Sequence, residues 1–284
     1  KSQFALVDLG REAMPLLESA LAAGAHQLKR IHAIWAIGQL MRLQGVKSDI
    51  LEQLLLDDDV EIRAQAARIL GDVRYRSAAD AIIPILQDTS ARVQFFAAEA
   101  LGRMAADQAI EPIINMLEAN NDKDAYLRHA GSLALARIGE VEPLIALADS
   151  PSRALRVAAV LALRRLRSPQ ITSFLDDPDE YVLTEAARAI NDDLSIEKAL
   201  PDLGKVLQLQ DIGNEALIRR ALNANLRTGS EEGVRLLVEF AEDQSRHEAL
   251  RAEAIACLGT WAEPSVFDRV DGRFRGEIKR DPGM

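Results

Sequence analysis

A helical segment that recurs along the chain limits its fold more than any other feature. The stretch Val60–Val73 places small and apolar side chains at helical spacing and closes near Gly71. Seven other segments align with it on the residue equivalent to Gly71, which we call the reference position. The eight reference positions are Gly38, Gly71, Gly102, Ala136, Arg164, Asn191, Leu226 and Gly259. Their separations of 27 to 35 residues are typical of repeated helical pairs.

The residues around each reference position predict closely packed helices. Five residues before it, every copy has Ala or Gly, and two before it all but one copy has a small side chain, the exception being Ile69. A further apolar helix precedes each copy, beginning with Met14–Leu21. We therefore predict an all-α fold, a right-handed α-solenoid of about eight helical pairs over residues 1–263. Residues 264–284 read as a nonrepetitive C-terminal extension.

Acidic and turn-forming residues separate the two helices of several pairs, as in Asp57–Asp59 and Asp176–Asp179. Such residues cap the helix that follows. Eight residues before the reference position, five copies carry an arginine: Arg30, Arg63, Arg128, Arg156 and Arg251. We expect this ladder to pair with aspartates of neighbouring joints, each exposed pair contributing about 0 to 1 kcal/mol. Phosphate binding is the less favoured alternative.

The repeated D-x-x-V-R-x-x-A-A-x-A-L-G character resembles the short HEAT-like repeats of phycobilisome lyases, over about residues 11–262. This resemblance implies an α-solenoid. It says less about function, because solenoids of this kind serve many tasks. Two functions remain open: a noncatalytic scaffold or interdomain spacer, and a chromophore lyase-like enzyme that uses the concave groove of the solenoid.

A narrower resemblance rests on Tyr181–Asp193 and Trp261–Arg275. These segments are similar to the HEAT part of large secreted bacterial proteins that join a sorbosone-dehydrogenase-like propeller to a c-type cytochrome. The resemblance implies a periplasmic or secreted protein with redox modules, and without it we expect a cytoplasmic one. The sequence has neither the CxxCH motif nor a propeller, and it starts at Lys1. We therefore expect a fragment of a longer protein.

Composition argues against several classes of partner. The formal net charge of −10 disfavours nucleic acid and anionic membrane surfaces. No run approaches the roughly 18 apolar residues of a membrane span, so membrane insertion is not expected. The single cysteine, Cys257, stands at an apolar helical position, which predicts a buried thiol and leaves the compartment open.

The sequence carries no established catalytic or cofactor motif. P-loop, G-x-S-x-G and G-x-G-x-x-G patterns do not occur. One HEAT-repeat enzyme, deoxyhypusine hydroxylase, binds two irons through His-Glu pairs, which would fall seven and six residues before the reference position. No copy here has both residues, although His129 occupies the first of these places. We expect no metal, no cofactor and no catalytic residue.

The candidate recognition surface is the ridge seven and three residues before each reference position, which lie one helical turn apart. Its bulkiest members are Trp35 in the first copy and a central group comprising Phe95, His129, Leu133, Val157 and Leu161. Two interpretations stay open. If the ridge is exposed, it docks a protein partner or a neighbouring domain of the same polypeptide. If the solenoid curves strongly, adjacent repeats bury these side chains.

Overall fold

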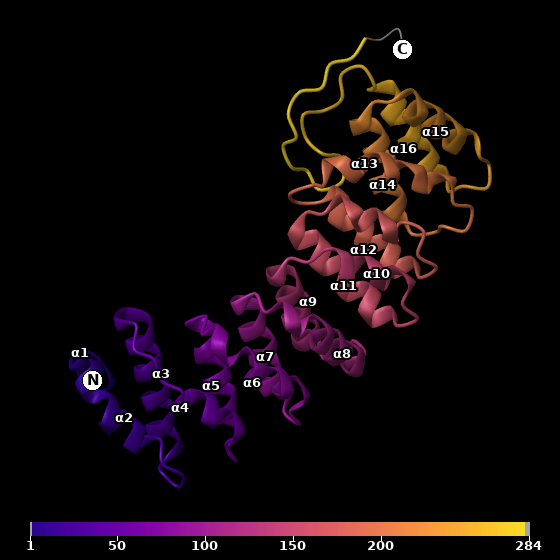
Figure 1. Cartoon of the computed structure of the whole chain (residues 1–284). Coiled ribbons are helices and arrows are strands. Elements are labelled where there is room, and N and C mark those ends of the chain that lie inside the picture. The colour runs from indigo at the N-terminus through magenta and orange to yellow at the C-terminus, as the bar shows by residue number, and fades with distance from the viewer. Residues whose placement is uncertain (1, 282–284) are drawn as a thin grey trace. The chain divides into compact units, whose positions relative to one another are not determined.

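The computed structural model describes residues 2–281, which form two compact units divided between Glu140 and Val141 (Figure 1). Helices dominate both units, and within residues 2–281 the only β pairing is an isolated bridge between Phe267 and Phe274. Each unit stacks four helical pairs. The predicted all-α solenoid of about eight pairs is confirmed.

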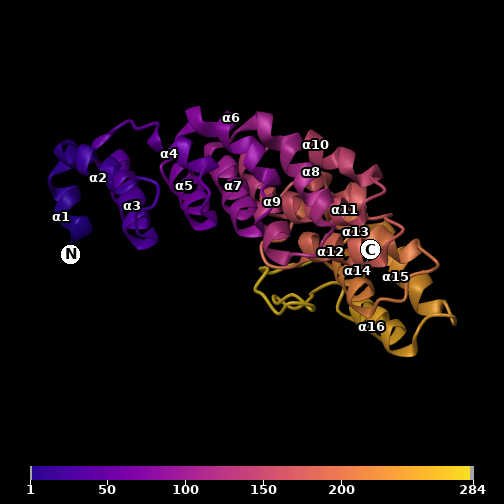
Figure 2. The same ribbon diagram turned by 90° about the horizontal axis from the view of Figure 1, so that it is seen from below.

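Unit 1 begins with a short helix, α1 (Ser2–Asp8), that contacts α3. Its pairs are α2 (Met14–Ala20) with α3 (Gln27–Gln44), α4 (Ile50–Gln53) with α5 (Val60–Asp72), α6 (Ala79–Ile82) with α7 (Ala91–Met104), and α8 (Ile110–Asn120) with α9 (Ala125–Ile138). Successive second helices α3, α5, α7 and α9 pack on one another in a row. The first helices α4 and α6 lie together along one side of that row (Figure 2).

Unit 2 contains the remaining four pairs and the C-terminal segment. Its pairs are α10 (Glu142–Ala146) with α11 (Arg153–Leu166), the 3-10 helix Pro169–Phe174 with α12 (Glu180–Asn191), α13 (Leu200–Lys205) with α14 (Glu215–Thr228), and α15 (Glu231–Glu242) with α16 (Glu248–Gly259). Several first helices in both units are short and continue as a 3-10 turn. In α6 this change coincides with Pro84, which has no N–H to continue the α-helix.

The recurring glycines are explained by the approach of successive second helices. A Cβ placed on Gly71 would lie 2.6 Å from Cα of Ala100, and one on Gly102 would lie 2.6 Å from Cα of Ala134. Ala100 and Ala134 each stand two residues before the next reference position. The small residues of the two sequence columns therefore meet in space, and a larger side chain at either place would force the helices apart.

Three of the five ladder arginines pair with an aspartate of a neighbouring joint, as predicted, and two do not. Arg30, Arg63 and Arg156 bond to Asp57, Asp88 and Asp177, each at the next joint along the chain. Arg128 instead pairs with Asp122 of its own joint. Arg251 donates to the carbonyl of Ala241 and the side chain of Gln244.

The expectation that these pairs are exposed was wrong. The side chains of Arg63 and Asp88 are 15% and 10% accessible. Their burial follows from their place under the turn between two helices, where the arginine also donates to joint carbonyls such as that of Asp57, 2.7 Å away. Burial would raise the pKa of Asp88, but the Arg63 guanidinium and the Ser90 N–H hold it below its usual value.

The C-terminal extension is not separate from the solenoid. Residues 264–281, which we call the strap, run back beside α12 and α14 of unit 2 as the yellow segment of Figure 1. Arg280 fixes its far end by donating to the carbonyls of Trp261 and Leu226, at 2.6 Å each. The last three residues of the predicted extension, 282–284, lie outside the described residues, as does residue 1.

Cys257 is buried in unit 2, as the sequence predicted. Burial raises the pKa of its thiol to about 11, because a thiolate loses hydration in an apolar site. The side chain therefore acts as core filling.

Candidate partner-binding site

The structure divides the predicted ridge between the two units. Trp35, Phe95 and Leu133 are half-buried and His129 is exposed, all on second helices of unit 1. Leu161, on α11 of unit 2, is half-buried. The ridge is therefore available in unit 1, where the side chain of Phe95 meets Phe96 edge-on at 5.2 Å between ring centroids.

The prediction that the ridge is exposed is wrong at Val157. It retains 1% of its accessible surface. Residues 154–160 of α11 are all buried, because this helix carries apolar or small side chains around most of its circumference. Position within the repeat alone did not reveal that difference.

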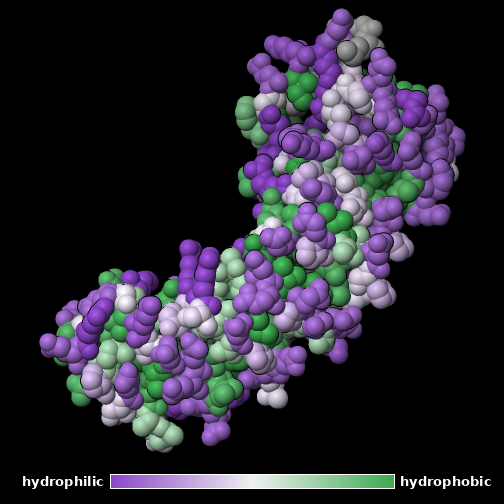
Figure 3. Space-filling model, in the orientation of Figure 1, coloured by the Kyte–Doolittle hydropathy of each residue, from purple (hydrophilic) through white to green (hydrophobic). Residues whose placement is uncertain are grey.

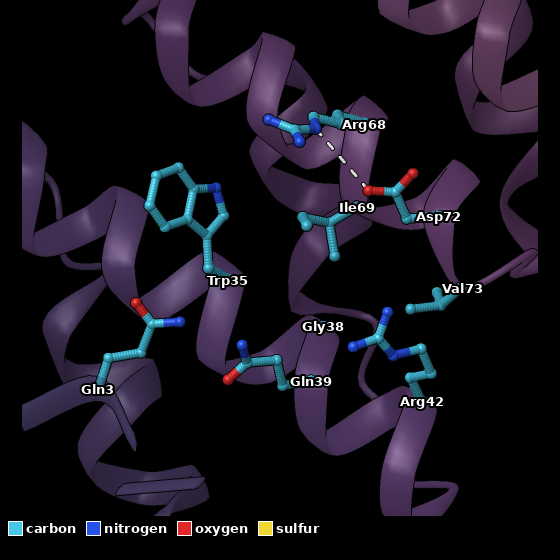
Figure 4. Close-up of a pocket in the computed structure, with 9 residues that line it drawn as sticks. All are labelled: Gln3, Trp35, Gly38, Gln39, Arg42, Arg68, Ile69, Asp72 and Val73. Atoms are coloured by element: carbon cyan, nitrogen blue, oxygen red, sulfur yellow. Dashed lines mark ion pairs between the residues drawn. The ribbon is translucent and has the colours of Figure 1, made fainter. Parts of the chain in front are cut away.

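A pocket of about 290 Å³ opens on unit 1 beside Trp35 (Figure 4). We call it the Trp35 pocket, and its walls come from α1, α3, α5 and the residue after α5. It is lined by Gln3, Trp35, Gly38, Gln39, Arg42, Arg68, Ile69, Asp72 and Val73. Its volume is close to the lower end of small-ligand pockets and suits one or two side chains of a protein partner.

The Trp35 ring is held in place by a chain of hydrogen bonds. Its Nε1 donates to Oε1 of Gln65 at 2.8 Å, and Nε2 of Gln65 donates to Oε1 of Glu61 at 2.7 Å. Nε of Arg92 in α7 donates to the other carboxylate oxygen at 2.7 Å and, as the largest influence, lowers the pKa of Glu61. This network links three second helices and orients the indole before any ligand arrives.

The pocket is lined by more positive than negative side chains. Arg42 is exposed and makes no ion pair within residues 2–281. Arg68 is only loosely paired, with its Nε 3.7 Å from Oδ2 of Asp72, the dashed contact of Figure 4. Asp72 is also bound by Arg103 from α7. The carboxylate that enters the pocket is therefore satisfied from outside it, and the two arginines remain available.

One polar atom of the pocket lacks a partner. Oε1 of Gln39 is buried, and no described residue donates a hydrogen bond to it. An acceptor shielded from water costs free energy unless a donor reaches it. Because this oxygen has almost no accessible surface, it marks an unmet hydrogen bond within the packing of α3 and not a contact point for a ligand.

Beyond the pocket, the second-helix face of unit 1 alternates rings with charged groups. The guanidinium carbons of Arg68 and Arg92 lie 5.9 and 5.1 Å from the Phe96 ring centroid. Glu99 accepts from Arg103 at 2.9 Å and from Arg137 at 3.0 Å. Figure 3 likewise shows hydrophilic and hydrophobic residues interspersed over unit 1 in that view. Such a surface favours specific polar contacts around an aromatic anchor.

The repeat pattern indicated Trp35 but not Gln39 or Arg42. The predicted ridge included only the places seven and three residues before the reference position, whereas these two stand one and four residues after Gly38. Because four residues make about one helical turn, Trp35, Gln39 and Arg42 follow one another along the same face of α3. Extending the ridge past the reference position would have revealed them.

In unit 2, the strap places a buried carboxylate among helix side chains. The Asp268 side chain is fully inaccessible. Its Oδ2 accepts from Nδ2 of Asn223 at 3.0 Å, from Nη1 of Arg227 at 3.3 Å and from Nε of Arg275 at 3.3 Å. We call this arrangement the strap site.

Backbone groups of the strap also donate hydrogen bonds to the Asp268 carboxylate. The backbone N–H groups of Val270 and Asp271 donate to Oδ1 of Asp268 at 2.9 and 3.1 Å. Burial would raise the pKa of Asp268, but these two N–H groups, the Asn223 amide and the Arg227 charge outweigh it and hold that pKa below its ordinary value. Asp268 is therefore a buried anion with a full set of donors.

Another hollow, of about 750 Å³, lies on unit 2 beside the joints at residues 149 and 176. No aromatic ring lines it, and its one cation, Lys205, is paired with Asp202 at 2.9 Å. No group of three or more metal-ligating side chains occurs among residues 2–281. The Trp35 pocket is the better candidate site, because it combines a fixed ring with available donors.

Comparison with known proteins identifies the repeats. Residues 48–136 match the HEAT repeats family, so this part of the chain is similar to HEAT repeats. No curated protein matches the chain. No helix of the described residues has both the length and the apolar character of a membrane span.

The chain is also similar to several solved structures, each with a TM-score below 0.5. An engineered protein is 20% identical with a TM-score of 0.43, covering 92% of this chain and 80% of its own. Human deoxyhypusine hydroxylase in complex with glycerol is 17% identical (TM-score 0.38; 92% and 98% covered). The complex of CpcE and CpcF of phycocyanin lyase from Nostoc sp. PCC7120 is 23% identical (TM-score 0.39; 76% and 95% covered). None of these comparisons supports the dehydrogenase and cytochrome resemblance.

Proposed function

We propose that this chain is a noncatalytic protein-interaction scaffold, and that the second-helix face of unit 1 binds a protein partner or another domain of the same polypeptide. The observation that carries the proposal is the Trp35 pocket. An indole fixed by Gln65 stands there beside a cation, Arg42, for which residues 2–281 provide no ion pair. Rigid aromatic rings and arginines are the side chains that dominate binding energy at protein interfaces.

The residues of the pocket also support a noncatalytic role. Its only carboxylate, Asp72, is engaged by Arg103 and lies 3.7 Å from Arg68, which leaves no free base beside a nucleophile. The lining contains no Ser, Cys, His or Lys. Binding is therefore the activity that this set of side chains serves best.

The dehydrogenase and cytochrome neighbours stay a prediction about the parent protein. The gene sequence on both sides of this segment tests it, since it predicts a propeller and a CxxCH motif there. The scaffold proposal does not depend on that outcome, because a partner domain and a separate partner protein use the same face.

Site-specific photocrosslinking tests the proposed function. A photoreactive amino acid replaces exposed His129 on α9 in one variant and exposed Glu118 on α8 in a matched control. Both variants are produced in the native host, and adducts are identified by mass spectrometry. We expect a defined partner from position 129 that is absent from position 118, and the purified partner should bind the unmodified chain.

The same experiment can reject the proposal. Equal adducts from α8 and α9 would indicate nonspecific capture. Adducts from Glu118 alone would move the interface to the first helices. No adduct from position 129, with an intact fold by circular dichroism, would contradict binding on this face.

A further inference from the structure

The Trp35 pocket and the strap site occupy the same places in the repeat. The strap site uses the reference residue Asn191, together with Asn223 and Arg227, which stand three residues before and one after Leu226. The pocket uses the reference residue Gly38, Trp35 and Arg68 three residues before their reference positions, and Gln39 and Asp72 one residue after. Each site lies between two consecutive second helices, α12 and α14 in unit 2, α3 and α5 in unit 1.

The two sites differ in what fills them. In the strap site, the space left beside Asn223, Arg227 and Asp268 has a volume of only about 10 Å³. The Trp35 pocket keeps about 290 Å³. Gly38 contributes to the difference, because it places no side chain where Asn191 has an amide. The chain thus contains one filled and one open version of the same inter-repeat site.

The filled version shows which chemistry this place in the fold accepts. It holds a carboxylate on a tight turn, with donors from Asn223, Arg227 and Arg275, and with N–H groups of the turn itself. A carboxylate needs several donors of this kind to stay ionised away from water.

The open version carries its own donors in a different arrangement. Arg68 stands where Asn223 stands, while Asp72 replaces Arg227 and is neutralised by Arg103. Arg42 adds a second cation one turn further along α3. Two guanidinium groups with one externally satisfied carboxylate give the pocket a positive balance, although the whole chain is at −10.

We propose that the Trp35 pocket binds an aspartate or glutamate side chain presented by a turn of a partner protein. The carboxylate pairs with Arg42, which makes no ion pair within residues 2–281, and Arg68 adds positive charge from α5 on the other side of the pocket. Trp35 packs against the apolar atoms of the segment. This inference rests on the proposed function and adds the chemistry that the face recognises.

Short capped peptides test the inference on the full chain. One peptide reproduces strap residues 266–273, VFDRVDGR, and the second replaces its Asp268 equivalent by Asn. Binding is followed through the indole N–H signals of Trp35 and Trp261 in 15N NMR spectra, with the Trp35 signal assigned from W35F. We expect the aspartate peptide to shift the Trp35 signal in a saturable way, with at least about tenfold weaker binding of the asparagine peptide.

Matched variants connect the shift to the arginines. The double variant R42S/R68S should weaken the aspartate peptide at least about tenfold, because each substitution removes a charged donor. R76S removes an exposed cation from the 3-10 turn Arg76–Ala78 outside the pocket and should bind like the unmodified chain. Circular dichroism confirms that each variant folds.

Several results would overturn the inference. They are an unmoved Trp35 signal at millimolar peptide, a response confined to Trp261, equal binding of both peptides, and unchanged binding by R42S/R68S. These peptide-binding results are independent of the crosslinking result from position 129. A face that captures a partner without distinguishing Asp from Asn would reject carboxylate recognition and leave the scaffold proposal standing.

Discussion

The two units use the same inter-repeat site in opposite ways. In unit 1, the reference positions Gly38, Gly71 and Gly102 place no side chain between successive second helices, and the face above them stays uncovered. In unit 2, Nδ2 of Asn191 donates to Oδ1 of Asp268, and the backbone carbonyl of Asn191 accepts from Arg275 at 2.9 Å. The strap then leaves little space. One repeat framework thus provides both an internal docking site and an open one.

Removing the buried carboxylate should have the largest effect on this comparison. Asp268→Ala leaves Arg227, Arg275 and Asn223 without their common acceptor, and we expect a loss of about 3 to 5 kcal/mol in the free energy of unfolding of unit 2. Denaturant unfolding, together with proteolysis of the strap, measures it. E277Q is the control, because Glu277 is exposed and its pair with Lys279 contributes about 0 to 1 kcal/mol. Equal effects of the two variants would show that the strap is not held by Asp268.

Adding one methyl group should destabilise the chain at a tightly packed reference glycine and not at an open one. Gly71→Ala puts its Cβ against the backbone of Ala100, and we expect unit 1 to lose about 2 to 3 kcal/mol. Gly259→Ala meets nothing within 4 Å and should be neutral or slightly stabilising. Thermal unfolding of both variants checks the prediction. If Gly71→Ala is as stable as Gly259→Ala, the close approach of α5 and α7 is wrong.

Acid should weaken unit 2 through Asp268. Because the folded pKa lies below the unfolded value near 3.8, its contribution is present above that value and is lost as pH falls through the folded pKa. Between these two pKa values, the unmodified chain should lose up to about 1.4 kcal/mol per pH unit more than Asp268→Asn. Denaturant unfolding from pH 5 to about pH 2 measures the difference. Parallel curves for the two proteins would contradict this assignment.

The smallest predicted effect concerns the orientation of the indole. Trp35→Phe keeps a ring but leaves Oε1 of Gln65 without its donor, and we expect a loss of about 1 kcal/mol in unit 1. The conservative Arg92→Lys keeps the charge near Glu61 and should cost less. A Trp35→Phe variant as stable as the unmodified chain would show that the hydrogen-bond chain does not stabilise the pocket.

Much of the fold was predictable because it is local and repeated. Gly71, Ala100 and the ladder from Arg30 to Arg156 recur at fixed spacing, and their contacts are the ones expected for stacked helical pairs. The strap was not predictable in the same way. Its contact with Asn191 joins residues 77 positions apart, and no repeat pattern encodes it. The available signal was the departure from the repeat at Asn191 and Asn223, two polar side chains at buried positions.

The candidate site was only partly predictable. Trp35 stood out as a bulky residue in a tolerant column, but Arg42 and Gln39 became interesting only once the structure showed which charges were unpaired. Val157 illustrates the opposite error: a ridge position that is exposed on one helix becomes buried where the helix is apolar on most sides. Burial depends on neighbours in space, so a column of the repeat does not determine it.

Carbene footprinting of the full chain, with and without the partner captured at position 129, tests most directly whether the open face of unit 1 is the binding face. We predict that bound partner lowers labelling at Trp35, Arg68 and His129, while labelling at Glu118 and along the strap stays unchanged. Protection confined to α8, or to the strap and second helices of unit 2, would contradict the account.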